Sequence, residues 1–202
     1  MGLQKGSMIM NEQLLNLIKS RRSTRKFTAE PISRANLEVI LEAGRWAPSG
    51  HNQQSWFFTV ISDKAMFAEL NQRFRESAQH SSEAFIHKLL AKKDFDIFYH
   101  APVAVLVSAR EDAIMTEANC AAATQNMLLT AESLGLGSCW IGFAGFPFIN
   151  GQGKDLCEKL AVPEGFRPLY AVVLGHKQLQ NKEVRGPKRK ENWVYYHSFS
   201  GE

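Results

Sequence analysis

The sequence predicts a single globular domain that mixes helices and strands, and three observations support this class. Three short apolar runs, at residues 56–61, 102–108 and 169–174, have the length and composition of buried strands. The segments between them place apolar residues at helical spacing. A chain of 202 residues with 45% hydrophobic content can bury a full core, and one domain is the default at this length. We expect that domain at residues 11–202, after a flexible lead at residues 1–10.

The N-terminal part of the chain is expected to contain two helices. Asn11 suits the N-cap of the first, whose leucines and isoleucine lie on or beside one face. Ser33 caps a second helix over residues 34–47, which has a clear apolar stripe. Pro48 biases the residue before it away from helical angles, so the second helix ends there.

The middle of the chain is expected to alternate strands with helices. Residues 56–61 (WFFTVI) are almost continuously apolar, which is typical of a strand covered on both faces. A helix follows from Asp63 to about residue 77. Residues 79–99 are polar and mixed, which indicates helical pieces and a cover over part of the domain. Residues 102–108 then form the second buried strand.

The C-terminal half contains the longest predicted helix, from about residue 112 to residue 134. Its early turns are rich in alanine, so it needs close neighbours, at the centre of the domain or at a subunit interface. Residues 139–142 are expected to form a short strand or turn, residues 148–160 a helix and residues 169–174 the third buried strand. The remainder, from about residue 176 to residue 202, is a polar arm.

Charge and cysteine content narrow the class of protein. The net charge of +4 and the pI near 9.0 are a mild excess that suits nucleic acid, an anionic cofactor or no charged partner at all. Three widely spaced cysteines indicate buried free thiols in a reducing compartment. The histidines never fall at metal-ligand spacings, so no metal site is expected. Without a secretory signal or an apolar run near the roughly 20 residues of a membrane span, we expect a cytoplasmic protein with no membrane partner.

Residues 20–26 (SRRSTRK) form the first of two polar segments that suggest a ligand site. They combine three arginines, one lysine and three hydroxyl groups. Guanidinium forks and hydroxyl donors suit phosphate oxygens. The alternative is a solvated basic helix end, which the helix dipole favours. On this segment alone, the solvated helix end is the better interpretation.

The second polar segment is the turn at residues 47–56 (APSGHNQQSW). Gly50 permits backbone angles that other residues avoid, and short polar side chains offer donors and acceptors to a flat polar ligand. An ordinary connection between a helix and a strand explains the segment equally well. The sequence has no Gly-x-Gly-x-x-Gly fingerprint after a strand, no Walker loop and no Gly-x-Ser-x-Gly elbow, which argues against hydrolase and nucleotidase functions.

Together, the motifs resemble those of the FMN-dependent nitroreductase family. Residues 21–25 look like the family's opening signature. Residues 48–56 resemble its Pro-Ser-x-x-Asn-x-Gln-Pro-Trp pattern, with Ser55 in place of the commoner proline, a change that leaves the polar contacts in place. Residues 125–142 and 187–190 are similar as well, so the resemblance extends over nearly the whole domain with its motifs in family order.

The resemblance implies an α+β fold with a mixed, mostly antiparallel central sheet wrapped by helices, assembled as an intertwined homodimer with FMN at the subunit interface. The residues that match contacts to the phosphate and ribityl chain are Arg21, Arg22, Ser23, Arg25, Lys188, Arg189 and Lys190. Those that match contacts to the isoalloxazine are Pro48, Ser49, Gly50, Asn52, Gln54, Ile141 and Gly142. Asp94 and Ile97 would fall near the ring as well.

The resemblance also implies the chemistry of a flavin-dependent NAD(P)H oxidoreductase. NADH or NADPH would pass hydride to flavin N5, and a nitroaromatic or quinone acceptor would then take the same place, which gives ping-pong kinetics. No side chain is needed as an obligatory acid or base. His51 and Phe98 are the expected substrate contacts, although a surface position for His51 and core packing for Phe98 explain these residues at least as well.

Two other functions stay open at this point. A protein of the same fold that binds or handles FMN without general nitroreductase turnover would carry the same motifs, because a fold does not fix a chemistry. A basic nucleic-acid-binding module is the other, but aromatic residues are sparse in both basic segments, so no nucleic-acid partner is expected. The expected partners are a second copy of the chain and a small-molecule acceptor.

Overall fold

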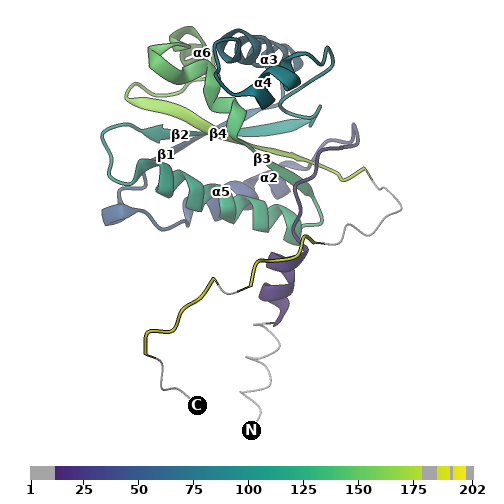
Figure 1. The fold of residues 1–202 in the computed structure, drawn as a ribbon, viewed down its shortest axis with the longest axis vertical. Coiled ribbons are helices and arrows are strands. Elements are labelled where there is room, and N and C mark those ends of the chain that lie inside the picture. Colours follow the sequence, from purple (N-terminus) through teal and green to yellow (C-terminus); the bar gives the residue numbers. More distant parts are fainter. Residues whose placement is uncertain (1–11, 179–185, 192, 199–202) are drawn as a thin grey trace.

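The computed structural model describes residues 12–178, 186–191 and 193–198, and a four-stranded sheet forms its centre (Figure 1). In spatial order β1-β2-β4-β3, the strands are β1 (Trp56–Ile61), β2 (Val103–Arg110), β4 (Phe166–Gly175) and β3 (Gly137–Ile141). All three pairings between these strands are antiparallel. An isolated parallel bridge from Ser23 to Ser138 gives the β3 edge a mixed character. The expected α+β fold class is confirmed.

Helices cover the sheet on both faces, as Figure 1 shows. On one face lie α2 (Arg34–Arg45) and α5 (Thr116–Ser133), and on the other lie α3 (Lys64–Ala78), α4 (Ala84–Leu90) and α6 (Lys154–Lys159). Each face has its own apolar core, because successive residues of a strand point to opposite sides. Within β2, for example, Leu106 packs into one core and Val105 and Val107 into the other.

The helix starts follow from capping residues that the sequence reveals. The hydroxyl of Ser33 accepts a hydrogen bond from the backbone N–H of Asn36 at 3.1 Å. The carboxylate of Asp63 accepts bonds from the backbone N–H groups of Ala65 and Met66. Each cap satisfies backbone donors that a first helical turn leaves free. The helices expected after these residues are therefore confirmed.

Three details of the expected fold are wrong. The strand at residues 56–61 is not covered on both faces, because β1 is an edge strand in which Val60 is 41% exposed. Helix α5 starts at Thr116 and not near residue 112, because Met115 adopts a left-handed conformation. The helix expected at residues 148–160 is replaced by the 3-10 segment η2 (Gly142–Gly151) and the short α6, since Asn150, Gly151 and Gly153 adopt left-handed angles that interrupt a helix.

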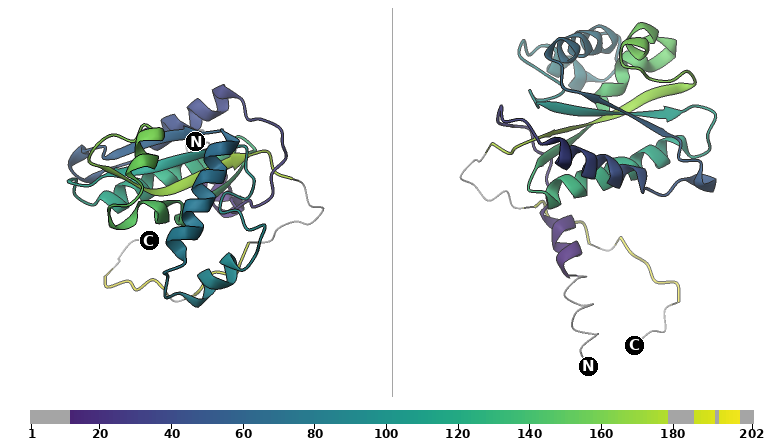
Figure 2. Two further views of the ribbon diagram at one scale, coloured as in Figure 1. Left: turned by 90° about the horizontal axis from the view of Figure 1, so that it is seen from above. Right: turned by 180° about the vertical axis from the view of Figure 1, so that it is seen from behind.

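The two ends of the described chain stand away from the sheet. Residues 12–20 form an exposed helix, and Leu14, Leu15 and Ile18 on it are about half exposed. Figures 1 and 2 show this helix and the arm at residues 186–198 extending on the same side of the domain. Asn11 and residues 1–10 lie outside the described part. In the part that the structure describes, no helix has the length and apolar character needed to cross a bilayer.

Candidate functional site

A basic edge lies along the outer side of β3. Ser23 forms the bridge to Ser138, and the backbone N–H of Thr24 donates to the Ser138 carbonyl at 2.8 Å. A Cβ on Gly137 would come within 2.7 Å of the Thr24 side chain, so this glycine allows the close approach. The pairing fixes residues 21–25 beside the strand. We call Arg21, Ser23 and Arg25 the β3 basic edge.

The charge of this edge is not compensated within the described residues. Neither Arg21 nor Arg25 forms an ion pair with a described carboxylate. Arg25 is exposed, donates from Nε to the Tyr99 hydroxyl at 3.3 Å and lies 5.7 Å from the centre of that ring. It lines a cleft of about 480 Å³ together with Lys92, Lys93, Asp94 and other residues of the same loop. Such an edge can hold a phosphate through charge-assisted hydrogen bonds.

Arg22 has a different role from its two arginine neighbours. Its Nη1 donates to the carbonyls of Lys19 and Arg21, at 2.6 and 2.8 Å, so the side chain caps the N-terminal helix. A Cβ on Gly186 would overlap the Arg22 guanidinium, so the arm passes directly beside it. The basic residues Lys188, Arg189 and Lys190 follow shortly after Gly186 in the arm, and all three are exposed.

The thiols near these elements are held in the neutral form. Burial raises the pKa of Cys139, while Arg25, Ser23 and Arg21 act in the opposite direction. Burial alone raises the pKa of Cys120 to about 12. Since the thiolate is the reactive form, neither cysteine is set up as a nucleophile near neutral pH. Within the described residues, no group of three or more metal-binding side chains occurs.

The second group of expected site residues forms a polar stretch, residues 48–54, between α2 and β1. Its backbone is unusual, because His51, Asn52 and Gln54 have positive φ angles of 50°, 53° and 46°. The side chains of these three residues are exposed. Gln54 donates from Nε2 to Asn52 Oδ1 at 3.1 Å, and its backbone N–H donates to Ser49 Oγ at 2.9 Å. The stretch thus presents a fixed row of polar groups at the surface.

The β3 basic edge and the polar stretch lie at opposite corners of the sheet. Ser138 pairs with Leu174, which pairs with Val103 at the start of β2. At the far end of β2, the Arg110 N–H donates to the Ser55 carbonyl, and β1 is the opposite edge strand. At about 3.3 Å per residue along a strand, the two groups are more than roughly 20 Å apart. One chain does not bring them together.

Residues Ile141 and Gly142 lie at the end of β3, on the strand that carries the basic edge. Ile141 is buried at 3% exposure, whereas Gly142 is exposed. A Cβ built on Gly142 would meet no atom within 4 Å, so the space in front of its backbone is open. A flat ligand can therefore approach the chain closely at this point.

The predicted substrate contact Phe98 lies in the core. Its ring is 1% exposed and packs against Phe67, at 5.1 Å between ring centres. Ile97 is buried to the same degree, whereas Asp94 is exposed and lines the cleft beside Arg25. Phe98 and Ile97 thus pack in the core, and the substrate role of Phe98 stays a prediction. His51 stays an exposed residue of the polar stretch.

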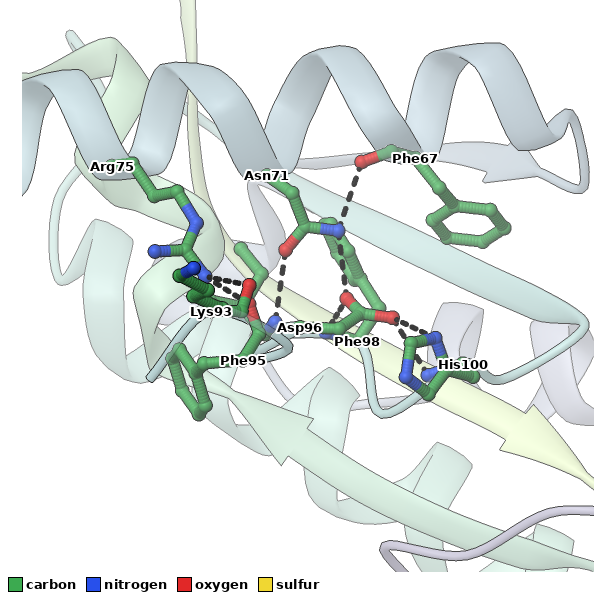
Figure 3. A network of polar contacts seen from close by, with 9 residues as sticks. Phe67, Asn71, Arg75, Lys93, Phe95, Asp96, Phe98 and His100 are labelled. Atoms are coloured by element: carbon green, nitrogen blue, oxygen red, sulfur yellow. Dashed lines mark hydrogen bonds and ion pairs between the residues drawn. The ribbon is translucent and has the colours of Figure 1, made fainter. Parts of the chain in front are cut away.

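The loop that carries these residues is fastened to α3, as Figure 3 shows. Asn71 donates to Asp96 Oδ1 at 2.7 Å and accepts from the Ile97 N–H at 2.9 Å. The guanidinium of Arg75 donates to four backbone carbonyls, those of Leu90, Lys92, Lys93 and Phe95. The cover expected at residues 79–99 thus contains α4 and a firmly held loop beside Arg25.

This α+β domain combines a basic edge whose arginines form no described ion pair, an open glycine directly after the same strand and a surface row of polar groups, and these are groups that suit a planar, phosphate-bearing cofactor. Comparisons with known proteins agree. Residues 18–176 match the model of the nitroreductase family. The chain therefore belongs to the nitroreductase family, as its motifs predict.

Individual relatives are similar over most of their length. A nitroreductase from Bacteroides fragilis, solved with bound FMN, is 32% identical, and the match covers 94% of this chain and 98% of that one, with a TM-score of 0.75. A nitroreductase from Desulfitobacterium hafniense, also solved with bound FMN, is 25% identical over 92% and 98% of the two chains, with a TM-score of 0.81. A Vibrio harveyi NADPH-flavin oxidoreductase is 31% identical over 177 residues, which are 85% of this chain and 68% of that protein.

Proposed function

We propose that this protein is an FMN-dependent NAD(P)H oxidoreductase that reduces nitroaromatic or quinone-type acceptors by a ping-pong scheme, with each FMN held between two copies of the chain. Family membership and the FMN-bound relatives support the cofactor and the enzyme class. A relative named as an NADPH-flavin oxidoreductase supports the electron donor. The acceptor, the kinetic scheme and the shared site are the proposal.

The separation between the β3 basic edge and the polar stretch carries the proposal of a shared site. Both groups match the family's cofactor contacts, yet they lie more than roughly 20 Å apart on one chain. A second copy, related by a two-fold axis, can bring its polar stretch to the first copy's basic edge, and the reverse at a second site. Exposed apolar residues in the parts that stand off the domain, such as Leu14, Trp193 and Tyr195, offer surface for this assembly.

Each chain contributes binding and positioning to the reaction. Ser23 and Arg25 hold the phosphate, and the exposed Lys188 and Lys190 of the arm add positive charge on the same side. The open backbone at Gly142 supports one face of the ring, and exposed amides at Asn52 and Gln54 bond its polar edge. When bound, FMN supplies the hydride chemistry. No described side chain is needed as an obligatory acid or base.

The first experiment is a test of colour and bleaching. We expect the purified protein to be yellow, or to become yellow with added FMN, and to lose its absorbance near the flavin maximum when NADH or NADPH is added without oxygen. Steady-state kinetics with menadione or nitrofurazone should then give parallel double-reciprocal lines. A colourless protein that FMN does not reconstitute would contradict the whole proposal, and intersecting lines would contradict only the kinetic scheme.

A protein that binds or delivers FMN without general turnover is the alternative, because the same binding groups would hold FMN in either function. The same experiment separates the two functions. Bound flavin that neither NADH nor NADPH bleaches anaerobically would favour the flavin-handling function.

A further inference from the structure

A single buried side chain, the amide of Asn119, fastens the polar stretch to the body of the domain. Asn119 lies in the first turn of α5 and is 3% exposed. Its Oδ1 accepts a hydrogen bond from the Gly50 N–H at 3.0 Å. Its Nδ2 donates to Ser55 Oγ and to the Ile114 carbonyl, both at 2.9 Å. One amide therefore holds both ends of the turn that carries His51, Asn52 and Gln54, and both of its donors are used.

The backbone of the polar stretch needs such an anchor. Three of its non-glycine residues have left-handed φ angles, a conformation that persists only where the surroundings fix it. Other hydrogen bonds also stabilise the turn, among them those from the Gln54 N–H to Ser49 Oγ and from the Ile114 N–H to Gln53 Oε1. Both involve partly or fully exposed groups, whereas the Asn119–Ser55 bond is buried and shielded from water.

Ser55 fixes the far end of the turn. Its side chain is 1% exposed, its hydroxyl pairs with Asn119, and its carbonyl accepts from the Arg110 N–H at 2.8 Å. Hydrogen bonds to α5 and to β2 therefore hold this residue in place.

We propose that Asn119, through its pair with Ser55 and its bond to Gly50, is a positioning residue that holds the polar stretch in the shape that receives the flavin. The inference rests on the proposed FMN site. Asn119 lies behind the stretch, so it acts through the backbone of Gly50. Its loss would alter the ring end of the site and leave the β3 basic edge unchanged, because the two lie at opposite corners of the sheet.

The test compares Asn119→Ala and Ser55→Ala with a matched control, Thr124→Val. Thr124 is also fully buried on α5, and its hydroxyl donates to the Cys120 carbonyl at 2.8 Å, but it has no hydrogen bond to the stretch. Asn119→Asp keeps the acceptor for the Gly50 N–H and removes both donors. Two quantities are measured: amide hydrogen exchange at Gly50 in FMN-free protein, and the Kd for FMN from quenching of flavin fluorescence.

We expect Asn119→Ala to speed exchange at Gly50 and to weaken FMN binding about tenfold, the usual effect of one lost buried hydrogen bond that leaves a partner unpaired. Ser55→Ala should weaken binding about threefold, and Asn119→Asp should lie between wild type and Asn119→Ala. Thr124→Val should lower the Tm but leave the Kd within about twofold. If Asn119→Ala does not fold, Asn119→Asp and Ser55→Ala give the answer.

Two outcomes would overturn the positioning role. In one, exchange at Gly50 is the same in wild type and the Asn119 variants. In the other, exchange speeds up, but FMN binding weakens only in proportion to the loss of Tm. Thr124→Val and Asn119→Ala would then weaken FMN binding equally. Failure of the proposed function looks different, because the wild-type protein itself then takes up no FMN while the exchange measurement still reports whether Asn119 holds the stretch.

Discussion

The β3 basic edge and the polar stretch solve two binding problems in different ways. The basic edge consists of exposed and half-buried side chains, fixed by one bridge to Ser138, that form no ion pair with a described carboxylate. The polar stretch consists of short side chains on a left-handed backbone that a buried amide fastens to α5. A phosphate needs charge and tolerates some freedom, whereas a planar ring needs a fixed surface. The comparison therefore predicts that charge changes act at one group and shape changes at the other.

The largest effect is expected from the charge at the basic edge. Arg25→Ala should weaken FMN binding by about ten- to a hundredfold, because a charge-assisted hydrogen bond is worth about 1.5–3 kcal/mol. The Kd is measured by fluorescence titration. Arg22→Ala is the matched control, since its guanidinium already bonds the Lys19 and Arg21 carbonyls. That variant should change the Kd by less than about threefold and lower helix stability instead. A loss of FMN from Arg22→Ala alone would show that the motif is shifted by one residue.

A change of shape at Gly142 sharpens the comparison. Gly142→Val should weaken FMN binding at least about tenfold, because the added methyl groups fill the open space before the backbone. The Tm of the FMN-free protein should hardly change, since a Cβ there meets no atom within 4 Å. Gly135→Ala is the control with the reverse pattern. Gly135 has a φ of 73°, so alanine should cost about 1 kcal/mol of stability without affecting the Kd. If Gly142→Val and Gly135→Ala had the same Kd for FMN, this would contradict the proposal that Gly142 lies against the flavin ring.

The smallest expected effect is a loss of stability at high pH, caused by the buried thiol of Cys120 in the core between the sheet and α5. Burial raises the pKa of Cys120 to about 12, from an ordinary value of 9.0. Between these values the folded protein keeps the proton and the unfolded chain loses it, so stability is complete below pH 9 and falls as the pH rises. From pH 9 to pH 10, this thiol should remove about 1 kcal/mol of unfolding free energy. Urea unfolding at pH 9 and pH 10 gives the unfolding free energy of each protein. Between these pH values it should fall by about 1 kcal/mol more in wild type than in Cys120→Ala, and an equal fall in the two proteins would contradict the prediction.

The sequence predicts the long strands well. Apolar runs mark β1, β2 and β4 because a strand in a domain of this size buries whole side chains. The edge position of β1 is not visible in the sequence, since a run such as WFFTVI looks the same at the edge and in the centre of a sheet. The helix expected at residues 148–160 fails because Gly151 and Gly153 adopt left-handed angles, which outweigh the apolar spacing around them.

The sequence does not reveal the role of residues whose contacts lie far away along the chain. Asn119 lies in an alanine-rich helix, and no local pattern indicates that its amide bonds Gly50, 69 residues earlier. Phe98 is open to two interpretations in the sequence, a substrate contact or core packing, and only the tertiary structure shows that it packs against Phe67. In both cases, contacts between segments that are distant in the sequence decide what the residue does, and no local pattern reveals them.

The central claim is that one FMN is held by the basic edge of one chain and the polar stretch of another. Arg25→Ala damages the first group, and the double variant Asn52→Ala with Gln54→Ala damages the second. A dimer of either variant alone has one altered group at each of its two sites. In a mixed dimer, one site combines the altered basic edge with the altered polar stretch, whereas the other combines the two unaltered groups and is intact.

The most direct test is therefore the FMN content of mixed dimers, purified with two different affinity tags after co-expression. We predict that they regain one tightly bound FMN per two chains, with the wild-type Kd. If each site were built within one chain, every site in the mixture would carry a lesion. Mixed dimers that bind FMN no better than the two parent variants would contradict the account.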